Sequence, residues 1–324
     1  MRILIAGGAG YIGSHMVKLL GRAGADLVIL DDLSNGYADA ITAGEFIRGD
    51  LGDAALLRRI VGTGNFDAVM HFGAFIEVGE SVADPLRYYQ NNVAATVTLL
   101  REMQAAGIRR FVFSSTAAIF GEPLTDLIDE DHPKRPINPY GRSKLMVETL
   151  LEDCDAAFGL KSCCLRYFNA AGADPEGQLG ERHEPETHLI PLVLQAASGR
   201  RRNIRIFGTD FPTPDGTAVR DFIHVDDLCQ AHQLALDHLL AGGDSARFNL
   251  GNGKGYSVRQ VIDTVAKVTG RQFEVEESDR RLGDPARLVA DSQRIKAALG
   301  WNPKHDLETI IRDAWQWEQK ISTD

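Results

Sequence analysis

The stretch Arg2-Ile3-Leu4-Ile5-Ala6-Gly7-Gly8-Ala9-Gly10-Tyr11-Ile12-Gly13 decides the fold of this chain. Its apolar run predicts a strand, its glycines at positions 7, 10 and 13 predict a tight turn, and the residues to Arg22 predict a helix. Such a turn brings backbone N–H groups and a helix N-terminus close to a pyrophosphate. The next apolar run, 27–30, ends in Asp31, whose carboxylate can bind ribose hydroxyls and repel a 2′-phosphate. The unit therefore predicts NAD binding and disfavours NADP.

Strand and helix patterns alternate along the first half of the chain. Strands are predicted at 2–6, 27–30, 45–48, 68–72, 111–115 and 161–166, and helices at 54–61, 85–106 and 140–158. This alternation predicts an α/β fold with a doubly wound, Rossmann-type parallel sheet. Later helical patterns at 258–269 and 307–319 predict a smaller C-terminal α/β domain. We expect an NAD-binding domain over residues 1–168, to which later segments can return, and a second domain over residues 169–324.

A tyrosine and a lysine four residues apart form the second motif. On a helix, Tyr140 and Lys144 share one face, and an ammonium one turn away is expected to lower the pKa of the phenol. Thr116 follows the predicted strand 111–115, so its hydroxyl should lie at the carboxyl edge of the sheet. These three residues are candidates for acid–base chemistry beside the cofactor.

Composition excludes several classes of function. A net charge of −10 over 324 residues argues against a broad nucleic-acid interface. No apolar run is long enough to span a bilayer, and the first residues show no signal-peptide pattern. The cysteines, at positions 154, 163, 164 and 229, have no metal-type spacing with histidine, so we expect no metal site and a cytoplasmic protein.

With these motifs the chain resembles the extended short-chain dehydrogenase/reductases and, among them, the UDP-glucose 4-epimerases of the NAD-dependent epimerase/dehydratase family. Further segments that carry the resemblance are His71-Phe72, Val78-Gly79-Glu80-Ser81, Arg166-Tyr167-Phe168-Asn169 and Arg220-Asp221-Phe222-Ile223-His224. The resemblance implies reversible C4 epimerisation of UDP-glucose and UDP-galactose through a transient 4-keto sugar, with tightly bound NAD. It also implies a C-terminal domain that binds mainly the UDP-sugar, and a homodimer that pairs the helices 85–106 and 140–158.

The resemblance also implies residue roles. Tyr140 would be the general base and acid, Lys144 its tuner and a cofactor ribose ligand, and Thr116 the hydroxyl on the substrate side. The positions implied to contact NAD are Gly7, Gly10, Tyr11, Ile12, Gly13, Asp31, Asn35, Asp50, Leu51, Phe72, Asn92, Ser114, Tyr140, Lys144 and Phe168. The positions implied to contact the UDP-sugar are Thr116, Asn169, His188, Leu189, Arg205, Phe207, Arg220, Arg281, Asp284 and Leu288.

Departures from the family pattern leave alternatives open. Relatives often carry a cofactor-contacting lysine where Ile76 stands, and dehydratases carry an acid where Ala117 follows Thr116, which argues against dehydration. Leu288 leaves acceptance of N-acetylhexosamines undecided. The alternatives are a 4-epimerase of UDP-pentose, UDP-uronic acid or UDP-N-acetylhexosamine, a net dehydrogenase or reductase, and a non-catalytic NAD-binding sensor or scaffold. The last predicts loss of Tyr140 or Lys144, and both are present.

Overall fold

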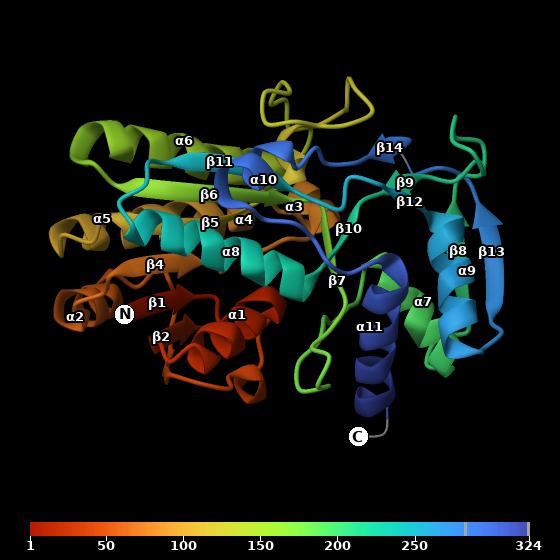
Figure 1. Ribbon diagram of the computed structural model, residues 1–324, viewed down its shortest axis with the longest axis horizontal. Coiled ribbons are helices and arrows are strands. Elements are labelled where there is room, and N and C mark those ends of the chain that lie inside the picture. Colours follow the sequence, from red (N-terminus) through yellow and green to blue (C-terminus); the bar gives the residue numbers. More distant parts are fainter. Residues whose placement is uncertain (282–283, 323–324) are drawn as a thin grey trace.

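The computed structural model describes residues 1–281 and 284–322, and its largest element is a seven-stranded sheet (Figure 1). The strands are β1 (Arg2–Ala6), β2 (Asp26–Asp31), β3 (Glu45–Arg48), β4 (Ala68–His71), β5 (Arg110–Thr116), β6 (Lys161–Tyr167) and β11 (Ala246–Leu250). Their order is β11-β6-β5-β4-β1-β2-β3, and all neighbours are parallel. The predicted doubly wound Rossmann-type fold is confirmed, and the strand order reverses between β1 and β4.

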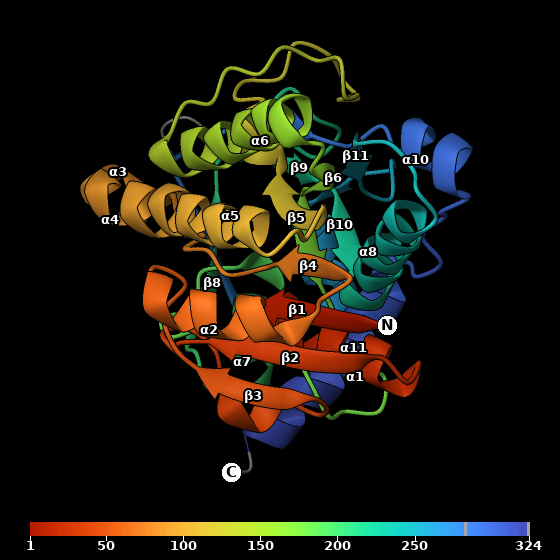
Figure 2. The same cartoon turned by 90° about the vertical axis from the view of Figure 1, so that its left-hand side faces the viewer.

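Helices cover both faces of the sheet, because successive strand residues point to opposite sides. Ile3 and Ile5 of β1 pack in one core with α1 (Tyr11–Arg22), α8 (Val225–Leu240) and α10 (Gln293–Leu299). Leu4 and Ala6 pack in the opposite core with α2 (Ala54–Gly64), α5 (Ala95–Ala105) and α6 (Pro139–Phe158). Figure 2 shows α5 and α6 across the sheet from α8. Burial on both faces explains why β1 is a continuous apolar run.

The helix predicted at 85–106 is interrupted, which corrects the expectation of one continuous helix. Its parts are α4 (Pro85–Tyr88), a π-helical segment (Tyr89–Ala94) and α5, and α3 (Val78–Ala83) precedes them. The buried Asn92 amide accepts from Phe75 N at 2.9 Å and donates to Phe75 O at 3.0 Å and to Ser143 Oγ at 3.1 Å. The π-helical segment contains this residue, which joins the loop after β4 to α6. Hydrophobic periodicity does not report such long-range bonds.

The C-terminal part builds smaller sheets around its own apolar core. Its strands are β7 (Asn169–Ala171) beside β10 (Phe222–His224), β8 (Asn203–Phe207) beside β13 (Glu274–Ser278), and β9 (Val219–Arg220) between β12 (Tyr256–Ser257) and β14 (Arg287–Leu288). The helices around its core are α7 (Leu189–Ser198), α9 (Val258–Thr269) and α11 (Leu307–Ile321). The returning β11 pairs with β6 of the large sheet.

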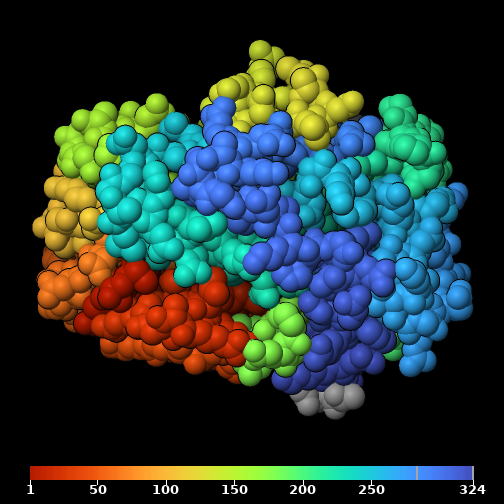
Figure 3. All heavy atoms as spheres, viewed as in Figure 1, coloured from red at the N-terminus to blue at the C-terminus, as the bar shows by residue number. Residues whose placement is uncertain are grey.

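The loop 172–188, between β7 and α7, joins the two parts. Figure 3 shows its green surface between the red N-terminal region and the dark blue α11. Lys18 Nζ donates to Asp174 Oδ2 at 2.6 Å, and Lys320 Nζ donates to Gly177 O at 3.0 Å. The loop is therefore anchored on both sides. Among the described residues, no helix combines the length and the apolar character that crossing a bilayer requires.

Candidate functional site

The turn between β1 and α1 requires its glycines. Gly7 has a φ of +79°, and a Cβ at this position would overlap the backbone nitrogen of Gly73. A Cβ at Gly13 would overlap the carbonyl oxygen of Gly7. The Asp31 carboxylate accepts a 2.9 Å hydrogen bond from Ala9 N, so the end of β2 supports the turn. The first turn of α1 thus lies at the carboxyl edge of the sheet, the position that suits a pyrophosphate.

A solvent-open cleft of about 540 Å³ lies beside this turn. Its lining includes the predicted NAD positions Gly7, Gly10, Asp31, Asn35, Asp50, Leu51 and Phe72. It also includes residues that sequence reasoning missed, namely Leu30, Asp32, Ser34, Gly36, Gly49, Gly73, Ala74, Phe75 and Asn91. Most of these are direct neighbours of a predicted position, which was the available signal. Ile76 follows Phe75 and is 36% exposed. The combination of a glycine turn, a strand-end carboxylate and apolar side chains fits a dinucleotide.

Several predicted NAD positions lie around this cleft and not on its lining. They are Tyr11, Ile12, Gly13, Asn92, Ser114 and Phe168, together with Tyr140 and Lys144, which are described below. The Tyr11 hydroxyl donates to Gly172 O at 2.7 Å, and Ser114 Oγ lies 2.7 Å from the Tyr167 hydroxyl. Ile12 packs against the α1 side of the core, and Phe168 packs against a small cluster around Phe120. A direct role of these residues in binding NAD stays a prediction.

Tyr140 and Thr116 meet at the carboxyl edge of the sheet. Tyr140 lies in the first turn of α6, and Thr116 is the last residue of β5. Gly141 permits this close approach, because a Cβ there would overlap the carbonyl oxygen of Ala118. The nearby Thr116 side chain acts to lower the pKa of Tyr140, which favours its ionised form. The structure therefore brings Tyr140 near Thr116, the residue that the sequence placed at this edge.

Burial dominates the electrostatics of Tyr140 and Lys144. Burial raises the pKa of Tyr140 to about 12, because it outweighs the opposite effect of Thr116. Burial also lowers the pKa of Lys144 to about 7, because it outweighs the opposite effect of the Glu148 carboxylate. Lys144 Nζ donates to Ser114 O at 2.8 Å. The expected lowering of the Tyr140 pKa by Lys144 is not found in this structure. The reason is that burial favours the uncharged form of both groups.

Glu148 anchors the helix that carries both residues. Its side chain lies one further turn along the same face of α6, at the i+4 position from Lys144. It accepts hydrogen bonds from Arg166 of β6 at 2.9 and 2.6 Å, and from Ser115 of β5 at 2.6 Å. The side chain of Arg166 is 0% exposed and that of Glu148 is 3% exposed. This pair was not predicted, although Glu148 follows Lys144 at the i+4 spacing of a helix.

Five of the predicted UDP-sugar positions converge in the C-terminal part. Arg220 of β9 lies opposite Leu288 of β14, and Arg220 Nη2 donates to Asp284 Oδ1 at 3.3 Å. Asp284 N donates to Arg281 O at 3.2 Å. The guanidinium carbon of Arg281 lies 3.9 Å from the centroid of the Phe207 ring. Two arginines and an aromatic ring therefore lie together, a set suited to a nucleoside diphosphate.

The other predicted UDP-sugar positions lie on neighbouring elements. Arg205 precedes Phe207 by two residues on β8, so both side chains share one face of the strand, and Arg205 Nη2 lies 3.3 Å from Glu276 Oε2. Asn169 Nδ2 donates to Asp221 O at 2.9 Å, directly beside Arg220. His188 and Leu189 form the start of α7. Thr116 is placed as described above.

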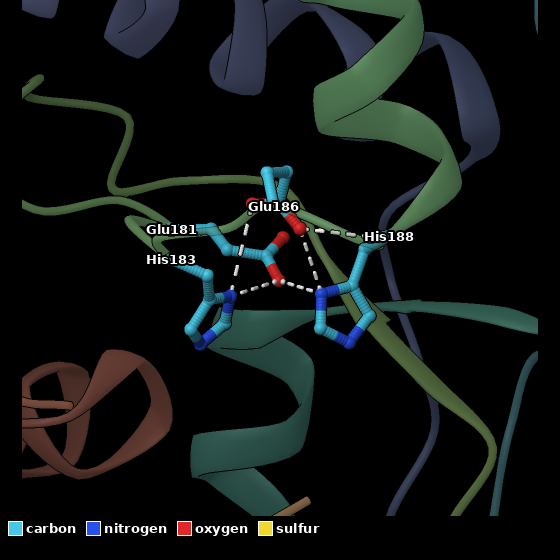
Figure 4. A group of neighbouring side chains, drawn as sticks. All are labelled: Glu181, His183, Glu186 and His188. Atoms are coloured by element: carbon cyan, nitrogen blue, oxygen red, sulfur yellow. Dashed lines mark hydrogen bonds and ion pairs between the residues drawn. The ribbon is translucent and has the colours of Figure 1, made fainter. Parts of the chain in front are cut away.

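His188 belongs to a cluster that sequence analysis did not predict (Figure 4). Glu181, His183, Glu186 and His188 come from one loop, and one ligand atom from each lies within 4.8 Å of the others. Burial disfavours the imidazolium form, but the two carboxylates outweigh this, raising the pKa of His183 to about 9 and that of His188 well above its usual range. Because its Nδ1 faces the carboxylates, His188 can offer only its Nε2 edge to a diphosphate.

Known proteins resemble this chain along its whole length. Residues 3–251 match the model of the NAD dependent epimerase/dehydratase family. The UDP-glucose 4-epimerase of Halalkalibacterium halodurans is 50% identical over 321 residues, covering 99% of this chain and 96% of the relative. A crystal structure of a UDP-glucose 4-epimerase superimposes with a TM-score of 0.97 at 51% identity, covering 99% of this chain and 98% of that chain.

A further solved structure was determined with ligands. The UDP-glucose 4-epimerase of Stenotrophomonas maltophila, with bound NAD and formylated UDP-arabinopyranose, has a TM-score of 0.97 at 39% identity, covering 100% of this chain and 99% of that chain. The agreement in sequence and fold extends over the cleft, the Tyr140 region and the C-terminal part. The chain therefore belongs to the NAD-dependent epimerase/dehydratase family.

Proposed function

We propose that this protein is a UDP-sugar 4-epimerase that interconverts UDP-glucose and UDP-galactose with bound NAD. The observation that carries the proposal is the proximity of Tyr140, in the first turn of α6, to Thr116, at the end of a strand whose sheet also holds the glycine turn and the cleft at its carboxyl edge. The identity to UDP-glucose 4-epimerases over nearly the whole chain supports the same reaction. A scaffold or sensor would not need the acid–base pair of Tyr140 and Lys144.

The N-terminal cleft would hold NAD. Gly7 and Gly10 would approach the pyrophosphate, Asp31 would accept hydrogen bonds from the adenosine ribose, and Asp50, Leu51 and Phe72 would line the cofactor. When bound, NAD supplies the reversible oxidation at the C4 carbon of the sugar. Residues 1–168, with the returning segments, would thus bind the cofactor, and residues 169–324 would bind mainly the UDP-sugar.

Tyr140 would remove and return the proton of the 4-hydroxyl group. Thr116, whose hydroxyl lies near Tyr140, would orient that hydroxyl from the substrate side. Lys144 lies one turn along α6, where its ammonium would favour the phenolate and contact the cofactor ribose. The buried environment favours neutral Tyr140, so positive charge brought into the site would ease its ionisation.

Firm binding of the UDP part would leave the hexose free to present either face. Arg220 and Arg281 offer planar, multi-donor groups for the diphosphate, and Phe207 offers a ring for the uracil. The Nε2 of His188 and the first turn of α7 at Leu189 would add donors on another side. Leu288, opposite Arg220, would border the sugar.

The decisive experiment compares the wild type with Tyr140→Phe. We expect Tyr140→Phe to keep its NAD and to lose about 10²–10⁴-fold in turnover of UDP-glucose, the usual contribution of a positioned acid–base group. Tyr88→Phe is a matched control, because the Tyr88 hydroxyl is also buried and donates to Glu77 O at 2.7 Å. Near wild-type turnover in Tyr140→Phe would reject the assignment. Activity of the wild type on UDP-pentoses, UDP-uronic acids or UDP-N-acetylhexosamines alone would change the substrate and keep the mechanism.

We also propose a cytoplasmic homodimer. The cysteines are free, which suits a reducing compartment. Val82 of α3, Leu86 of α4 and Met146 of α6 are 63%, 78% and 46% exposed, so these neighbouring helices present large apolar side chains to solvent. Light scattering should give twice the chain mass, and Leu86→Asp should reduce it. A monomer at micromolar wild-type concentration would contradict the dimer.

A further inference from the structure

The four side chains of the loop before α7 form a compact set of metal-type ligands. In Figure 4 the side chains of Glu181, His183, Glu186 and His188 turn toward one another. The side chains of Glu181 and Glu186 are only 7% and 6% exposed. Two buried carboxylates this close together need positive charge between them.

The distances among these ligands suit a tetrahedral ion. His188 Nδ1 lies 3.0 Å from Glu181 Oε1 and 3.0 Å from Glu186 Oε1. His183 Nδ1 lies 3.2 Å from Glu181 Oε1 and 3.7 Å from Glu186 Oε2. A tetrahedral zinc site with bonds of about 2.1 Å holds its ligand atoms about 3.4 Å apart. The four nitrogen–oxygen distances bracket this value, with Glu186 facing one histidine through Oε1 and the other through Oε2, and one ligand atom of each residue lies within 4.8 Å of the others.

The contact of His183 with the carboxylates is not an ordinary hydrogen bond. Its Nδ1 is buried and has no partner with hydrogen-bond geometry, although two carboxylate oxygens lie near it. A proton on this nitrogen therefore satisfies neither carboxylate well. A cation between the four side chains would contact all of them.

Other groups already hold the ligands in place. Glu186 Oε1 accepts hydrogen bonds from Thr187 N at 2.7 Å and His188 N at 2.8 Å. Thr187 Oγ1 donates to Glu77 Oε2 at 2.9 Å, and Trp317 Nε1 donates to Glu181 O at 3.1 Å. Bonds of this kind orient metal ligands before the ion binds.

We propose that Glu181, His183, Glu186 and His188 bind one divalent transition-metal ion, best matched by Zn²⁺, which fixes the loop leading into α7. Two neutral imidazoles and two carboxylates carry a charge of −2, which one divalent ion cancels. Nitrogen and carboxylate ligands at tetrahedral spacing suit zinc, whereas Mg²⁺ and Ca²⁺ take six or more oxygen ligands. The ion has no part in the epimerase chemistry. Its place is structural, at the start of α7.

The test is a zinc titration of the full-length, chelator-treated protein, followed by calorimetry and, with Co²⁺, by visible absorption. We expect one saturable site per chain, the visible absorption of a tetrahedral Co²⁺ site, and a higher Tm with the metal. His183→Gln and Glu181→Gln should each weaken Zn²⁺ binding at least tenfold. His238→Gln is the matched control and should bind like the wild type, because the imidazole of His238 hydrogen-bonds among the described residues with Asp244 O alone, at 2.9 Å.

Two results would overturn the proposal. The first is the absence of saturable Zn²⁺ binding by the wild type, which would mean that protonated imidazoles alone neutralise the carboxylates. The second is equal binding by the wild type and His183→Gln, which would place the ion elsewhere, for example on the thiols. If His183→Gln fails to fold, Glu186→Gln provides the same comparison. The titration needs no UDP-sugar, so its outcome is independent of the proposed epimerase activity.

Discussion

Replacing Glu148 by glutamine should destabilise the protein strongly, although residue 148 lies outside the cleft. The change leaves the guanidinium of Arg166, which is 0% exposed, without its carboxylate. It also weakens the bond from Ser115, which ties β5 to α6. Breaking a buried ion pair by removing one partner costs about 3–5 kcal/mol. This is a large part of a typical stability of about 5–15 kcal/mol.

The matched control is an exposed ion pair in the same protein. Lys267 Nζ lies 2.8 Å from Glu308 Oε2, but the two side chains are 71% and 43% exposed. Glu308→Gln should therefore cost at most about 1 kcal/mol. Urea unfolding, followed by circular dichroism, gives the change in the free energy of unfolding for each variant. If Glu148→Gln costs no more than Glu308→Gln, the buried pair does not hold α6 in place, and our account of how Tyr140 is positioned fails.

Three further variants test the site. Gly141→Ala places a Cβ against Ala118 O, so we expect α6 to shift and turnover to fall at least tenfold with little change in NAD affinity; unchanged turnover would contradict the close contact. Asp31→Asn should weaken NAD binding more than NADP binding, measured as the ratio of the two Kd values, and an unaltered ratio would exclude a role for Asp31 in selecting the cofactor. For Lys144, burial lowers the folded-state pKa from 10.5 to about 7. Between pH 7 and 10.5 the folded protein therefore binds fewer protons than the unfolded chain, so its stability rises with pH. Between pH 7 and 9 the free energy of unfolding should therefore rise by about 2 kcal/mol more in the wild type than in Lys144→Met. An equal rise in both proteins would refute the lowered pKa.

Local patterns were sufficient to predict the fold. The run from Arg2 to Gly13 predicted β1, the turn and the start of α1, because a buried parallel strand is continuously apolar and the turn has room only for glycine. The position of Asp31 at the end of β2 followed from the same periodicity. The π-helical segment was not predicted, and neither were the bonds that its Asn92 makes to Phe75 and Ser143, because hydrophobic periodicity does not report contacts between residues distant in the sequence.

The candidate site was predicted in part. The strand pattern placed Thr116 at the carboxyl edge of the sheet, and the family resemblance implied that Tyr140 acts beside it. The Glu148–Arg166 pair and the Glu181 cluster were missed. Glu148 meets Arg166 only because α6 packs against β6, which the sequence does not show. Two of the four residues in the cluster are glutamates, and a search based on cysteine and histidine spacing does not include glutamates. The pKa of Tyr140 was expected to fall, but burial, which sequence does not report, has the larger effect.

The most direct test of the central claim uses the purified wild-type protein and UDP-glucose, with no cofactor added. The products are followed by NMR, and the account predicts UDP-galactose, because NAD retained in the cleft beside Gly7 and Asp31 supplies the oxidation and Tyr140 supplies the proton transfer. Absence of UDP-galactose both without and with added NAD would contradict the account.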